Sequence, residues 1–109
     1  MNFYQIEQGI SQIEQAYFNG AFSDSVIRDD LQTRKAMDTY STFGSTGRQT
    51  NELAKKKDFY IRDFNDVLNT IDLVINWMRD NQPGNSSFIT RCENCKTQIN
   101  KLLSIVRSF

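Results

Sequence analysis

The sequence predicts an all-α protein: a small antiparallel helical bundle of three to four helices, with a long hairpin formed by the third and fourth. Three observations predict this fold. Apolar residues recur at alternating intervals of three and four in three long segments, which is the period of an amphipathic helix. No segment shows the strict apolar–polar alternation of a half-buried strand. One proline and five glycines leave few residues that would interrupt helices.

Size and charge restrict the function. The 109 residues suffice for one domain, 1–109, with a single core. Thirteen basic and thirteen acidic residues cancel, which disfavours nucleic acid and membrane surfaces as partners, because both attract a basic excess. The chain has no histidine, the most common general base and metal ligand. We therefore expect no catalytic residue, no cofactor and no metal site, and we expect that the protein is not an enzyme.

The first helix is predicted over residues 2–19. Its apolar residues follow a heptad spacing: Phe3, Ile6, Ile10, Ile13 and Tyr17. Asn19-Gly20 is expected to end the helix in the left-handed conformation that glycine favours.

A second helix is predicted over residues 24–41, beginning at a cap among Ser23, Asp24 and Ser25. Its apolar face is the weakest of the chain. The helically spaced line consists of Val26, Asp30, Thr33, Met37 and Tyr40, and Ile27 and Leu31 lie beside it. We expect this helix to cover its neighbours poorly.

Residues 41–50 contain two glycines and five hydroxyl residues, and they predict a loop. Thr50 is the expected N-cap of a third helix over 50–81. Twelve of residues 59–78 are apolar, so this helix has an unusually wide apolar face and should contact partners on two sides.

Asn81–Asn85 predicts a turn, because Pro83 prevents continuation of the third helix. A fourth helix is predicted over 87–108, capped by Ser86 or Ser87. Its short connection makes it an antiparallel neighbour of the third helix. The sequence leaves open whether the first two helices lie end to end or side by side along this hairpin.

The two ends of the chain carry opposite charge. Residues 1–25 have three acidic residues and no basic one, and residues 84–109 have four basic residues against Glu93. The first and last helices should therefore attract each other if they are adjacent, although each exposed pair contributes only about 0–1 kcal/mol.

Cys92 and Cys95 form a CxxC motif, which has two interpretations. A single pair supplies two of the roughly four ligands that zinc needs, so a site would require cysteines from two chains. Both residues also fall on the apolar stripe of the fourth helix, where buried cysteine packs as a small hydrophobe. We prefer packing and keep a thiol or zinc protein as a second alternative function.

Basic residues gather in the 48–62 region, which gives the first alternative: a nucleic-acid-associated regulator. The candidate contacts are Arg48, Lys55, Lys56, Lys57 and Arg62. Clustering with Arg34 and Lys35 on one folded surface would favour this alternative, whereas dispersal among aspartates would favour protein binding. Three consecutive lysines fan out around a helix, so a single tight patch is not expected.

The preferred hypothesis is a non-enzymatic helical protein-binding module: a small adaptor, chaperone or immunity-type interaction protein that binds another protein or itself as a homodimer. The wide face of the third helix exceeds what the other helices should cover, and exposed apolar patches mark interfaces. The candidate interaction surface consists of Tyr60, Ile61, Phe64, Leu68, Ile75 and Trp77.

The sequence predicts a cytoplasmic protein without a membrane span. No apolar run approaches the roughly 18 residues that a span requires. The first residues lack the basic and apolar regions of a signal peptide, although export by a signal-less route stays open.

Overall fold

The computed structural model describes residues 1–43 and 50–109, and it confirms the all-α class and the long hairpin of the last two predicted helices. The described residues form four α-helices and no strand: α1 (Phe3–Glu14), α2 (Asp24–Phe43), α3 (Glu52–Asn81) and α4 (Ser86–Ser108). A π-helical turn, η1 (Gln15–Asn19), continues α1. The molecule is elongated, with extents of 62 × 21 × 20 Å.

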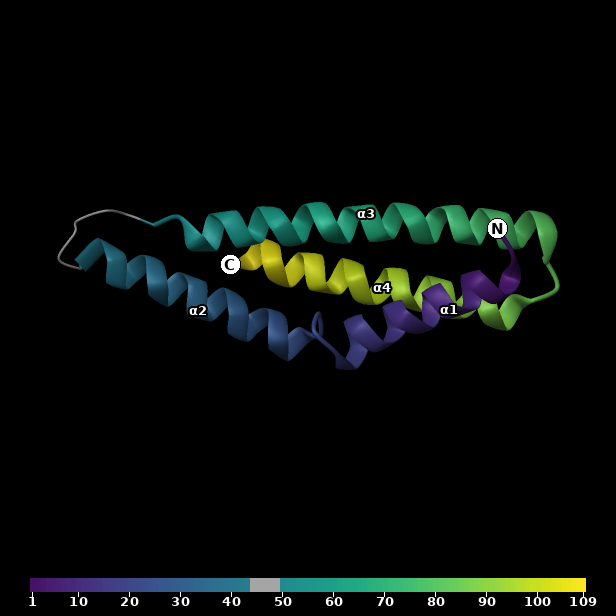
Figure 1. Cartoon of the computed structure of the whole chain (residues 1–109), viewed down its shortest axis with the longest axis horizontal. Helices are drawn as coiled ribbons and strands as arrows, with labels where there is room; N and C mark the ends of the chain where they lie inside the picture. Colours follow the sequence, from purple (N-terminus) through teal and green to yellow (C-terminus); the bar gives the residue numbers. More distant parts are fainter. Residues whose placement is uncertain (44–49) are drawn as a thin grey trace.

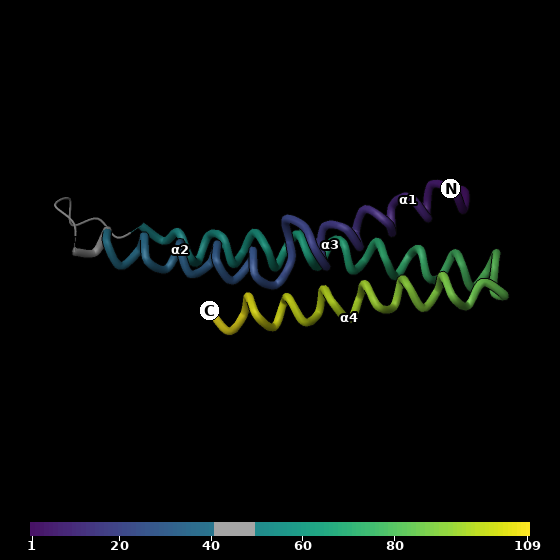
Figure 2. Tube along the Cα trace, turned by 90° about the horizontal axis from the view of Figure 1, so that it is seen from below, coloured from purple at the N-terminus to yellow at the C-terminus, as the bar shows by residue number. Residues whose placement is uncertain are grey.

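The hairpin of α3 and α4 forms most of the length of the molecule, and α1 and α2 lie end to end beside it (Figures 1 and 2). α1 contacts α4 near the 82–85 turn, and α2 contacts both α3 and α4 in the other half. The cross-section therefore contains three helices along most of its length. α4 ends at Ser108, so the C-terminal part of α2 and the first turns of α3 extend beyond it as a two-helix arm (Figure 1).

The break between α1 and α2 depends on Gly20, whose role differs from the predicted one. Its φ of −112° is not left-handed. Instead, a Cβ at this position would lie 2.6 Å from the carbonyl oxygen of Gln15, so only glycine allows the close approach. The Phe22 N–H donates to the carbonyl oxygen of Ala16 at 2.9 Å, which closes the reversal.

The core is continuous from one end of the hairpin to the other. Its aromatic centre lies where η1 and the 20–23 turn meet α3. Tyr17 and Phe22 stack with ring centroids 5.1 Å apart, and Phe64 meets both rings edge-on, at 5.3 Å and 5.9 Å. Burial of such rings supplies the largest apolar contribution to folding that single side chains make.

The predicted attraction between the first and last helices is confirmed. The guanidinium of Arg91 on α4 donates to both carboxylate oxygens of Glu14, at 2.7 Å and 3.2 Å, and to the hydroxyl of Ser11 at 3.2 Å. A bidentate pair of this kind fixes orientation more firmly than a single contact. It holds α1 in register against α4.

The start of α4 differs from the prediction by one residue. Asn85, rather than Ser86 or Ser87, is the N-cap, because its side-chain oxygen accepts the Phe88 N–H at 3.4 Å while α4 begins at Ser86. Asparagine is among the strongest N-cap residues, so the substitution of one cap for another leaves the helix in place.

Candidate interaction surfaces

α2 presents two faces of opposite character. Ile27 and Leu31 are completely buried against the hairpin. The helically spaced line predicted as its apolar face lies largely outside: Val26, Met37 and Tyr40 are 43%, 46% and 79% exposed. The predicted assignment of this face is therefore corrected, because the two residues beside the line, rather than the line itself, form the packing surface.

Phe59 of α3 belongs to the same exposed side. The Lys56 ammonium lies 3.9 Å from a carboxylate oxygen of Asp30, which is a member of the exposed α2 line, and 4.8 Å from the centroid of the Phe59 ring. Phe59 is 48% exposed. Asp24, by contrast, contacts Lys101 of α4 and lies about half a turn around α2 from Met37. The exposed side of the α2–α3 pair therefore faces away from α4.

We call this side the outer face of the α2–α3 pair. It consists of Val26, Thr33, Met37 and Tyr40 of α2 together with Phe59 of α3. Charged residues flank it on both helices: Asp29 is exposed on α2, and Lys55, Asp58, Arg62 and Asp66 are exposed on α3. The face thus combines large apolar side chains with flanking charges of both signs.

Polar contacts hold α2 against α3 beneath the outer face. The Arg34 guanidinium donates to Asp30 at 3.3 Å and to Glu52 at 3.0 Å. The Tyr60 hydroxyl donates to Asp30 at 2.5 Å. Burial, and then the Asp30 carboxylate, raise the pKa of Tyr60 above its ordinary value, so this tyrosine remains protonated as a donor.

Asp38 of α2 caps the beginning of α3. Its carboxylate accepts the backbone N–H groups of Glu52 at 2.8 Å and Leu53 at 3.0 Å, and the Thr50 hydroxyl at 2.7 Å. These bonds, that from Leu53 first, lower the pKa of Asp38. The predicted N-cap was Thr50, but the residue that precedes α3 is Asn51, and its side chain makes no capping bond. Asp38 of α2 accepts the N–H groups of Glu52 and Leu53 instead.

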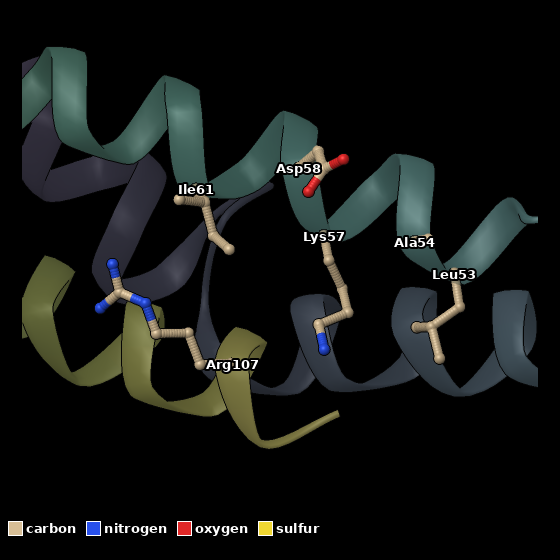
Figure 3. Close-up of a pocket in the computed structure, with 6 residues that line it drawn as sticks. All are labelled: Leu53, Ala54, Lys57, Asp58, Ile61 and Arg107. Carbon is tan, nitrogen blue, oxygen red and sulfur yellow. The ribbon is translucent and has the colours of Figure 1, made fainter.

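A groove of about 370 Å³ opens where α4 ends (Figure 3). Its lining residues are Leu53, Ala54, Lys57, Asp58 and Ile61 of α3 and Arg107 of α4. Lys57 extends from α3 and Arg107 from α4, and their charged ends lie apart from each other (Figure 3). Within the described chain no ion pair joins Lys57 or Arg107 to an acidic group. The groove is therefore weakly basic and open to solvent.

A second groove, of about 230 Å³, separates α1 from α3 and is mainly apolar. Ile6 and Ile10 of α1 and Ile71 and Val74 of α3 line it. Leu73 of α3, 65% exposed, does not line this groove. No charged side chain lines the groove, so its walls offer few groups that would orient a polar ligand.

The structure buries half of the interaction surface predicted on the third helix. Tyr60, Phe64 and Ile75 lie in the core, where Tyr17 and Phe22 cover the first two. These side chains are not part of the surface of the folded chain. The other three predicted residues, Ile61, Leu68 and Trp77, are half-buried and pack against the core. Tyr60 and Phe64 are buried because Tyr17 of η1 and Phe22 of the 20–23 turn cover their rings.

The candidate basic contacts do not form one patch. Lys56 pairs with Asp30, Lys57 lines the groove on the side of α4, and Lys55 and Arg62 are exposed beside the outer face. Arg34 is engaged with two carboxylates, and Lys35 is exposed on α2. Arg48 and the Gly44–Gly47 segment lie outside the described residues.

Cys92 and Cys95 are buried in the core and unbonded to each other. Burial raises the pKa of each thiol to about 11, which leaves it protonated at neutral pH. Protonated thiols are poor nucleophiles and poor metal ligands. The positions are those expected of packing residues.

Two further observations concern membrane insertion and similarity to known proteins. Among the described helices, none is both long and apolar enough to cross a membrane. Comparisons with protein-family models, with curated proteins and with solved structures give no significant match.

Proposed function

We propose that the chain is a non-enzymatic protein-binding module that contacts its partner through the outer face of the α2–α3 pair. The observation that carries this proposal is the exposure of Met37, Tyr40 and Phe59 on one side of a helix pair that is already packed on its other side. Large apolar and aromatic side chains of this kind are the residues that anchor protein interfaces.

The distribution of basic residues supports a protein partner over nucleic acid. Aspartate neutralises Lys56, and the remaining bases point to different sides of α3. A nucleic-acid site needs bases gathered along one surface, because each phosphate contact adds to affinity through release of counterions. The burial of both thiols likewise gives no support to a redox or zinc function.

Site-specific photo-cross-linking tests the proposal. A benzophenone amino acid replaces Met37 on the outer face or, as the control, Leu73, which is more exposed but lies outside that face. We expect a discrete protein adduct from position 37 and none of the same mass from position 73. Equal adducts from both positions, or none from position 37, would contradict the proposal.

Binding to labelled single-stranded and duplex oligonucleotides tests the alternative. We expect no sequence-independent association at low salt. Association that weakens steeply with salt, and that Lys55→Ala with Arg62→Ala removes, would favour nucleic acid and contradict protein binding as the principal function.

A further inference from the structure

The two-helix arm beyond the end of α4 lacks the apolar core that holds the rest of the molecule together (Figure 1). We define the arm as residues 33–40 of α2 and residues 50–56 around the beginning of α3. None of these residues is buried; among the described side chains, the last buried one on α2 is Leu31 and the first on α3 is Tyr60. Leu53 is half-buried at the edge of the core. Burial of apolar surface, the main source of stability, therefore contributes little to closure of the arm.

Polar contacts between α2 and α3 close the arm instead. The Arg34 guanidinium donates to Glu52 at 3.0 Å. The Asp38 carboxylate accepts the Thr50 hydroxyl and the backbone N–H groups of Glu52 and Leu53. The side chains of Arg34 and Glu52 are 31% and 27% exposed, so water reaches their ion pair. Contacts of this kind contribute little net free energy, because water replaces them when they open.

We propose that the arm opens as a single unit, by release of these polar contacts, while the core from Tyr60 onward stays folded. Regions with few buried apolar contacts and many solvent-exposed hydrogen bonds are those that open below the free energy of global unfolding. The end of α2 then lacks its contacts with α3, and a short helical segment without tertiary contacts unwinds readily.

Opening of the arm regulates the outer face, a consequence that rests on the proposed function. Met37 and Tyr40 lie on the arm, whereas Val26 and Phe59 lie outside it. The four side chains therefore form one surface only while the arm is closed. A partner that contacts all of them binds the closed state alone, so its apparent affinity falls in proportion to the fraction of chains that are closed.

The closing contacts are partly ionic, so salt should open the arm. Besides the pair of Arg34 with Glu52, the Lys56 ammonium of α3 lies 3.9 Å from the Asp30 carboxylate of α2. Salt screens partly exposed pairs such as these, whereas it does not screen apolar contacts in the core. The response to salt therefore separates opening of the arm from global unfolding.

Native-state hydrogen exchange of single amides, measured by NMR on the free chain, tests the inference. We expect the amides of Arg34–Tyr40 and those of Lys55 and Lys56 to share one opening constant, at least about tenfold larger than that of the Ile71–Met78 amides. An increase in sodium chloride from roughly 0.05 to 0.5 M should raise the constant of the arm alone, by about threefold. An arm that exchanges with the same constant as Ile71–Met78, or that salt does not open, would overturn the inference.

The variant Glu52→Gln tests whether the two helices of the arm open together. It removes the ion pair with Arg34 without changing any residue of α2, and we expect an opening constant about threefold larger in both helices of the arm. The matched control, Glu93→Gln, removes an exposed pair with Arg79 far from the arm and should leave its exchange unchanged.

Circular dichroism confirms that each variant folds. Faster exchange in Glu52→Gln that is confined to α3, with the α2 amides of the arm unchanged, would also overturn the inference. The exchange measurements involve no partner, whereas the adduct from position 37 requires one. Failure of this inference is therefore distinguishable from failure of the proposed function.

Discussion

Asp38 joins two helices through bonds that the first turn of α3 cannot make within itself. The first amides of any helix lack intrahelical acceptors, and here a carboxylate from another helix accepts two of them. The same negative charge lies at the positive end of the helix dipole. The cap therefore connects the local stability of α3 to the position of α2.

Replacement of Asp38 tests this connection. We expect Asp38→Ala to accelerate hydrogen exchange of the Glu52 and Leu53 amides, because both lose their acceptor. Asp38→Asn is the matched control, since an amide oxygen retains one acceptor and should give a smaller effect. Because the folded-state pKa of Asp38 is lowered, the wild-type cap is complete above the ordinary value of 3.8 and weakens as pH falls through the lowered pKa. Exchange rates in Asp38→Ala equal to those of the wild type would contradict this role.

Two buried thiols and a buried tyrosine, which stay protonated in the folded chain, make its stability fall at alkaline pH. The pKa is raised by burial from 9.0 to about 11 for both Cys92 and Cys95, and from 10.0 to about 12 for Tyr17. Above pH 9 the unfolded chain loses these protons before the folded chain does, so the free energy of unfolding falls as pH rises. The thiols act between about pH 9 and 11, and Tyr17 between about pH 10 and 12.

Urea unfolding at pH 7 and at intervals up to pH 11 measures this loss. The raised pKa of each thiol corresponds to roughly 2–3 kcal/mol of stability that is lost once that thiol is titrated. The variant Cys92→Ala with Cys95→Ala should be less stable at pH 7, because it leaves a cavity, yet should lose less stability between pH 9 and 11. Parallel losses in wild type and variant would show that the thiols are not the titrating groups.

At the scale of single elements, α2 shows how far helical periodicity alone can be interpreted. Spacing places Val26, Met37 and Tyr40 on one line, but it does not say which side of a helix is inside. The inward side also carries Arg34 and Asp38, which a sequence pattern counts as polar and hence as exposed. Residues of α3 form hydrogen bonds with both side chains, which allows them to lie in the interface. The sequence pattern of α2 alone does not show that these partners exist, so the polar contacts between α2 and α3 were not predictable from it.

A pair of alanine substitutions on α2 separates its two faces. Leu31→Ala removes a fully buried side chain, and we expect it to lower the free energy of unfolding by about 2–5 kcal/mol. Met37→Ala removes a half-exposed one and should cost less than about 1 kcal/mol. Chemical denaturation at low protein concentration measures both. A larger loss at Met37 than at Leu31 would reverse the assignment of the faces.

At the scale of the whole molecule, the helices and the hairpin were predictable, whereas the surface was not. Heptad spacing and the turn at Pro83 suffice to predict the long helices because each signal is local. The burial of Phe64 depends on Tyr17 and Phe22, which are distant in sequence and reach it only through the reversal at Gly20. Exposure is thus set by the path of the chain, which local patterns do not contain.

The central claim is that the outer face of the α2–α3 pair is a contact surface, and photo-cross-linking from position 37 against the control at position 73 tests it most directly. The measurement places the reactive group on the face itself and does not depend on the identity of the partner. We predict a discrete protein adduct from position 37 and none of the same mass from position 73. No adduct from position 37, or equal adducts from both positions, would contradict the claim.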